Sequence, residues 1–138
     1  MNEVSILRRN LLRACYLLLV VGTAFAFMSQ LPSAASLPLM DGAVYALLSA
    51  LGLLSIIGLF APLRMLPLLL FEIGWKALWL AFVALPRWQA GTVDQETIAT
   101  LFACAWVLPF VFIIPWRHVV ATYFRPEPWR SAAAPVAA

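Results

Sequence analysis

The chain has 138 residues, of which 64% are hydrophobic and only 11% are charged. A soluble domain of this size is usually about half apolar and a quarter charged, so the composition excludes a water-soluble fold. The net charge of +3 does not indicate nucleic acid binding, because the basic residues are distributed as in a membrane protein.

Four apolar stretches are long enough to cross a membrane, since a helix needs about 20 apolar residues for the roughly 30 Å hydrocarbon core. They cover residues 11–28, 43–61, 66–85 and about 98–116. We therefore expect an all-α fold, an integral membrane four-helix bundle forming a single domain over residues 1–125. The Pro- and Ala-rich segment 126–138 is expected to be a disordered cytoplasmic tail.

The first stretch also has the features of a signal peptide, with a basic start, an apolar segment and small residues at Ala24 and Ala26. Cleavage would leave three spans in the same orientation. The apolar run of 18 residues is longer than a typical signal segment, and the spacing of Gly22 and Ala26 suits helix packing. We expect the span to be retained as an anchor.

The connections carry signals for helix ends. Asp41 is a candidate N-cap for the second span, and the short connection 62–65 makes spans two and three antiparallel neighbours. Thr92 and Gln95 match a capping box that would start the fourth span near Val93.

The fourth span contains two prolines, Pro109 and Pro115. Each should kink the helix and free a carbonyl four residues earlier, at Ala105 and Val111. Beyond them, residues 116–124 are expected to form a short interfacial helix.

The basic residues predict the orientation. Seven arginines lie at the two ends of the chain and between spans two and three, whereas the other two loops hold only Arg87. Cytoplasmic loops are enriched in Lys and Arg, so both termini should be cytoplasmic.

Glu72 and Lys76 form the candidate polar centre of the third span. Ionisable residues at membrane depth are costly and mark functional sites by default. They lie at positions i and i+4 with Glu first, the better order for a helical ion pair. The functional interpretation is a centre for proton relay, headgroup binding or an anionic ligand. The structural alternative is a neutralised pair that holds the span in place, through Lys76 to the freed Ala105 carbonyl.

Trp75 and Trp79 repeat at four residues and form a candidate aromatic wall beside Lys76. Such a wall could hold a sterol, quinone or acyl chain, with cation–π support for the ammonium. Lipid-facing bulk is the alternative interpretation.

Catalytic and metal chemistry lack their residues. Cys15 and Cys104 lie at different depths, so a disulfide is not expected, and His118 is the only histidine. We expect no cofactor, no metal and no catalytic residue. An enzyme would have to use Glu72 as its sole acid or base.

Two motifs resemble a group of small, uncharacterised bacterial four-span inner-membrane proteins. They are the LPLLLFE…WK…W pattern over Leu66–Trp79 and the IPW pattern at Ile114–Trp116. The Gly-rich second span, which ends in Gly58, Leu59 and Phe60, is similar in architecture to the DoxX-like family. The resemblances imply a four-span fold in a bacterial inner membrane and no particular activity.

Small size and short loops therefore predict an accessory or structural subunit of a membrane assembly. Its expected partners are membrane lipids and further copies of the chain or a larger membrane complex. The alternative is a lipid- or quinone-binding protein, or a small transporter, with its polar centre at Glu72 and Lys76.

Overall fold

The computed structural model describes residues 4–126, and the regular elements within that range are all helical. Four of its helical stretches are long and apolar enough to cross a membrane: Ile6–Ser36, Leu39–Phe60, Leu66–Gln89 and Gln95–Ile113. The chain is therefore a multi-pass membrane protein. Apart from Pro126, the tail predicted for residues 126–138 lies outside the described residues.

The first two spans form a closely packed pair. Helix α1 (Ile6–Ala26) continues into the 3₁₀ segment η1 (Met28–Ser36), and α2 (Leu39–Phe60) returns along it. A Cβ added at Gly58 would collide with the Tyr16 ring, and one added at Gly52 would collide with Thr23. The small residues of the second span thus allow close approach, as expected.

Two expectations for the first span and loop were wrong. Gly22 contacts no helix, since a Cβ placed there would meet nothing within 4 Å. Asp41 lies in the first turn of α2, whose N-cap is Pro38. The fixed φ of proline favours a helix start, so α2 begins before the carboxylate can cap it.

The third span is one continuous helical stretch. It consists of α3 (Leu66–Trp79), a π-helical turn η2 (Leu80–Ala84) and α4 (Leu85–Gln89). The short inner turn before it was predicted correctly, whereas its outer end extends four residues beyond the expected Leu85.

The fourth span begins with α5 (Gln95–Ala105). Asp94 is its N-cap in place of the predicted Thr92, because the Asp94 carboxylate accepts the Thr97 N–H at 2.8 Å. Hydrogen bonds from the Thr97 hydroxyl and N–H hold the pKa of Asp94 below its usual value.

Both prolines of the fourth span interrupt it, as predicted. Helix α5 ends at Ala105, α6 (Leu108–Ile113) follows, and α7 (Trp116–Tyr123) is a separate short helix. The Val111 carbonyl that Pro115 frees accepts the Trp116 indole N–H at 2.7 Å.

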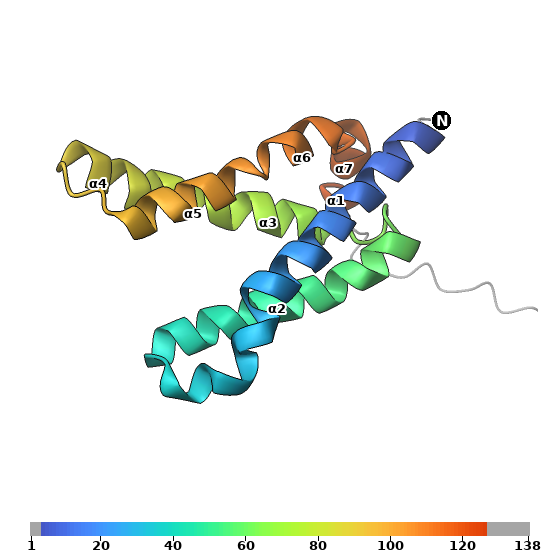
Figure 1. Cartoon of the computed structure of the whole chain (residues 1–138). Helices are drawn as coiled ribbons and strands as arrows, with labels where there is room; N and C mark the ends of the chain where they lie inside the picture. The colour runs from blue at the N-terminus through green and yellow to red at the C-terminus, as the bar shows by residue number, and fades with distance from the viewer. Residues whose placement is uncertain (1–3, 127–138) are drawn as a thin grey trace, which may run out of the picture.

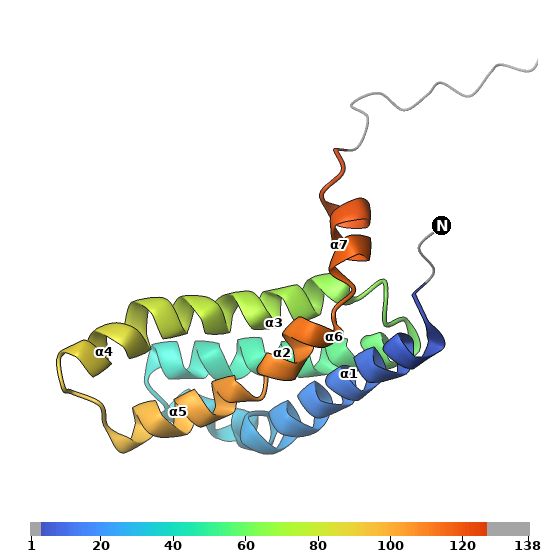
Figure 2. The ribbon, with the colours of Figure 1, turned by 90° about the horizontal axis from the view of Figure 1, so that it is seen from above.

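Helices α1 and α2 form one pair, and the third span with α5 and α6 forms the other; we call the separated parts of these pairs the two arms. The two pairs meet at one end of the molecule and diverge toward the other (Figure 1). The start of α1, the turn between α2 and α3, and α7 lie at the joined end, and α7 projects away from the spans there (Figure 2). The segment η1 and the loop between α4 and α5 lie at the far ends of the two arms.

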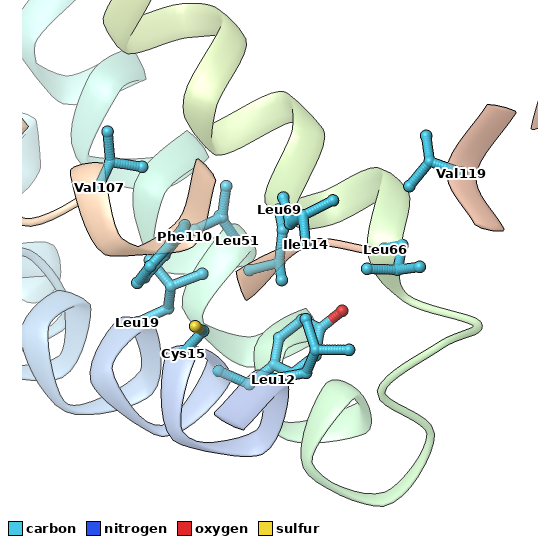
Figure 3. Close-up of a cluster of buried hydrophobic side chains, with 11 residues drawn as sticks. Leu12, Cys15, Leu19, Leu51, Leu66, Leu69, Val107, Phe110, Ile114 and Val119 are labelled. Atoms are coloured by element: carbon cyan, nitrogen blue, oxygen red, sulfur yellow. The ribbon is translucent and has the colours of Figure 1, made fainter. Parts of the chain in front are cut away.

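The main hydrophobic cluster lies at this joined end (Figure 3). It combines side chains of α1, α2, α3, α6 and α7: Leu12, Cys15, Tyr16, Leu19, Leu51, Leu66, Leu69, Val107, Phe110, Ile114 and Val119. The Tyr16 hydroxyl donates to the Pro62 carbonyl at 2.9 Å, and that of Tyr123 to the Leu63 carbonyl at 2.9 Å. Two helices therefore hold the turn between α2 and α3.

Candidate functional site

Glu72 and Lys76 face the interior of the protein. The buried residues of α3 are Leu66, Leu69, Glu72 and Lys76, a spacing that places them on one side of a helix. Glu72 is 4% exposed and Lys76 is 8% exposed. At 1.5 Å per residue, they lie about 9 and 15 Å along the helix from Leu66, so Lys76 is near the middle of the 24-residue third span.

Trp75 joins them in a group of three side chains on one helix. Lys76 Nζ lies 2.6 Å from Glu72 Oε1, and the Trp75 indole N–H donates to Glu72 Oε2 at 2.6 Å. The ammonium also lies 5.5 Å from the centre of the Trp75 ring. Both carboxylate oxygens thus have a donor, which a buried carboxylate requires.

The lysine retains donors that the protein does not use. An ammonium has three N–H groups, and among residues 4–126 its hydrogen-bonding partner is Glu72. The expected bond from Lys76 to the freed Ala105 carbonyl is not formed. The α3 group is therefore self-contained and does not tie the third span to the fourth.

A largely apolar cavity of about 290 Å³ adjoins this group. Its lining comes from all four spans: Leu18, Leu19, Gly22, Thr23, Ala26, Phe27, Leu48, Glu72, Trp75, Lys76, Ala103, Trp106 and Phe110. The Thr23 hydroxyl donates to the Leu19 carbonyl at 2.7 Å, so its proton is already used. Lys76 is a buried side chain of the lining that retains donors for a guest.

The cavity opens between α1 and the fourth span. Gly22 and Leu18 on one side, and Ala103 and Trp106 on the other, line it and are also exposed. The cavity is therefore accessible from the side of the helices and is not fully enclosed.

Only half of the predicted aromatic wall lies at this site. Trp75 lines the cavity, whereas Trp79 is half-buried and lies one turn further along the helix, outside the lining. Trp106 takes the second aromatic position. Trp106 lies in the break between α5 and α6 that Pro109 predicts. The sequence therefore indicated that the helix is irregular at Trp106, but the direction of its side chain depends on the tertiary fold.

The site offers no metal-binding set. Within residues 4–126, no three His, Cys, Asp or Glu side chains are grouped so that they could hold a metal ion. Cys15 and Cys104 are both buried free thiols.

Neither a protein-family model, nor a curated protein, nor a solved structure matches this chain. The two resemblances noted in the sequence therefore stay predictions. What the fold and the site define is a class: a helical multi-pass membrane protein with a buried ion pair beside an apolar cavity.

Proposed function

We propose that this protein binds a neutral, mostly apolar molecule with a carbonyl oxygen, such as a quinone or an ester-linked lipid. The observation that carries the proposal is the apolar cavity beside an ammonium with unused donors. Ligand pockets are typically apolar with a few convergent polar groups. The carbonyl would accept from Lys76, and the apolar body would lie along α1 and Trp106.

Charge favours a neutral ligand over an anionic one. Glu72 and Lys76 already neutralise each other at 2.6 Å. A further anion would bring an uncompensated charge into a medium of low dielectric constant, which is costly. A carbonyl oxygen uses the spare donors without adding charge.

The cavity volume limits how much of the ligand is enclosed. At about 290 Å³ it is just below the usual range of about 300–1,000 Å³ for ligand pockets. We infer that the cavity holds a ring or part of an acyl chain, while the rest of the molecule extends through the lateral opening into the bilayer.

Filling the cavity tests this proposal without altering the ion pair. Gly22 lines the cavity, and a Cβ there would meet nothing within 4 Å, so Gly22→Leu should fit the helix and occupy the ligand's space. The probe is a decyl-substituted benzoquinone, which quenches tryptophan fluorescence when it binds near Trp75 and Trp106. We expect about a tenfold or greater loss of affinity, equivalent to about 1.4 kcal/mol or more.

Gly74→Leu is the matched control. Gly74 is also helical and also has open space at its Cβ, but it does not line the cavity. Both changes replace a helical glycine with a better helix former, so neither should destabilise the fold. Equal quinone affinity in the two variants would contradict the proposal.

We also propose an orientation with both termini cytoplasmic and the four spans crossing as one unit. It is supported by the arginine distribution and by the position of the α1 start, the α2–α3 turn and α7 at one end of the molecule. The diverging ends would then face the other side of the bacterial inner membrane.

A second candidate function is that of a subunit in a larger membrane assembly, either of identical chains or of different proteins. The observation in its favour is that the outer part of the α3–α5 arm buries few side chains. Between positions 78 and 103, only Ala84 and Thr97 are buried. A particle larger than one chain in mild detergent would support it, and a persistent monomer without partners would count against it.

A further inference from the structure

A second, separate pocket lies at the joined end of the molecule. It has a volume of about 880 Å³ and lies between the start of α1 and the junction of α6 with α7. It shares no residue with the cavity beside Lys76. Ligand binding in this pocket therefore uses none of the residues of the proposed quinone or ester site.

Two arginines and a histidine line this pocket. They are Arg8, Arg117 and His118, and among residues 4–126 no acidic side chain lines it. Within the described part of the chain, the salt bridges are Lys76–Glu72 and Arg87–Asp94, so neither arginine is paired with a carboxylate there. Guanidinium groups match phosphate oxygens in a two-point geometry.

The backbone adds positive potential at the same place. Helix α1 begins at Ile6 after its N-cap Ser5, and α7 begins at Trp116 without a side-chain cap. Ser5 and Trp116 both line the pocket. Helix N-termini carry partial positive charge, so both helix starts reinforce the attraction that the arginines exert on an anion.

The rest of the lining is apolar. Val4, Val111 and Phe112 line the pocket together with the basic residues. A free phosphate ion would use only the basic residues. An amphipathic anion with hydrocarbon chains would use both kinds of residue, and Trp116 is of the residue type that is enriched at the level of lipid headgroups.

We infer that this pocket binds the phosphate group of an anionic phospholipid, with the acyl chains along Val111 and Phe112. Basic pockets between membrane helices on the cytoplasmic side are suited to such headgroups. Arg8 and Arg117 bond the phosphate oxygens, and His118 lies beside them.

The test counts lipids retained by the purified protein in native mass spectrometry. Phosphatidylglycerol is the anionic probe, and phosphatidylcholine is the zwitterionic comparison. The unaltered protein should retain phosphatidylglycerol preferentially. In Arg8→Gln with Arg117→Gln, affinity should fall about tenfold for each arginine, the usual effect of one charge-assisted hydrogen bond.

The matched control is Arg9→Gln with Arg64→Gln, which removes the same net charge. These two arginines lie at the same end of the molecule but line a different surface hollow, which shares no residue with the basic pocket. An equal loss in both double variants would overturn the inference, because it would mean diffuse surface attraction. Displacement of the lipid by inorganic phosphate at equal concentration would overturn the assignment to a lipid.

Arg8→Lys with Arg117→Lys separates charge from geometry. Lysine retains the positive charge but loses the two-point contact. We expect affinity between those of the unaltered and glutamine variants. Both arginines are exposed, so elution volume and tryptophan fluorescence should show that all variants fold.

Discussion

At the scale of single residues, the α3 group of Glu72, Trp75 and Lys76 satisfies a buried carboxylate with donors from its own helix. The two oxygens accept from Lys76 and from Trp75, each at 2.6 Å. Because no other span supplies a donor to this carboxylate within the described residues, the group can form as α3 itself folds. The exposed pair of Arg87 and Asp94, at 3.4 Å, has no comparable role, since such surface pairs contribute little.

This geometry predicts strong coupling between the two charges. Lys76→Met leaves the buried Glu72 carboxylate without its counter-charge. Glu72→Gln likewise leaves the buried Lys76 ammonium without its counter-charge. Each single variant should lose about 3–5 kcal/mol of unfolding free energy. The double variant should recover most of it, because the amide oxygen introduced at position 72 can still accept from Trp75. Denaturant unfolding of the four proteins measures the coupling.

The double variant also separates a binding role from a structural one. If it folds normally but no longer binds the benzoquinone probe, Lys76 is a ligand contact. Additive losses of stability, without recovery in the double variant, would show that the two charges do not form a coupled pair.

At the scale of elements, the two helix pairs differ in how closely they pack. Gly52 and Gly58 let α2 approach α1 to within contact of Thr23 and Tyr16. The outer part of the α3–α5 arm contains the π-turn η2 and has few buried side chains. Large apolar residues on it, such as Phe82 at 75% exposure, face lipid or another chain.

If the second candidate function holds, this arm forms the subunit contact. Phe82→Ala should then shift the protein toward smaller particles in mild detergent, because it removes an aromatic side chain from the interface. Phe25→Ala is the matched control, since Phe25 is 79% exposed on the other arm. Size-exclusion chromatography with light scattering measures both, and identical profiles would argue against an interface through Phe82.

At the scale of the whole molecule, one end is held together and the other is open. Tyr16 and Tyr123 bind the turn between α2 and α3 from two different helices, and the main hydrophobic cluster surrounds that point. Both the apolar cavity and the basic pocket follow from this arrangement. The first lies where the pairs begin to separate, and the second lies where α1 meets the α6–α7 junction.

The proposed orientation predicts the accessibility of introduced cysteines in intact cells. Ser36→Cys and Ala90→Cys, at the ends of the two arms, should react with a membrane-impermeant maleimide. Ala121→Cys on α7 should react only after permeabilisation. The native Cys15 and Cys104 are 3% and 2% exposed and should remain unlabelled. The reverse pattern would place the termini outside.

Local signals in the sequence predicted many features of single segments. The four apolar stretches, the breaks at Pro109 and Pro115, and the short turn after α2 depend on neighbouring residues, and each was found. The cap predicted at Asp41 was wrong because α2 begins three residues earlier, after Pro38, and has no side-chain cap. The capping box at Thr92 was wrong because Asp94, a nearby polar residue, caps α5 instead.

The site was predictable only in part, because the sequence indicates the geometry within a helix but not the contacts between spans. Glu72 and Lys76 were found because charge at membrane depth is rare and because an i, i+4 pair is a local geometry. Trp106, Gly22 and Phe110 come from other spans, so their meeting at one cavity depends on how the pairs diverge. The spacing of Gly22 and Ala26 in α1 predicted helix packing, whereas both residues instead line the cavity.

The sequence by itself determined that this is a four-span membrane protein with a charged pair inside its third span, because hydropathy and helical spacing are properties of each segment. Only the tertiary structure decided what that pair adjoins. The divergence of the helix pairs leaves the cavity between all four spans, and the turn at Pro115 places Arg117 in the same pocket as Arg8. Both depend on contacts between residues far apart in the chain, which no local pattern encodes.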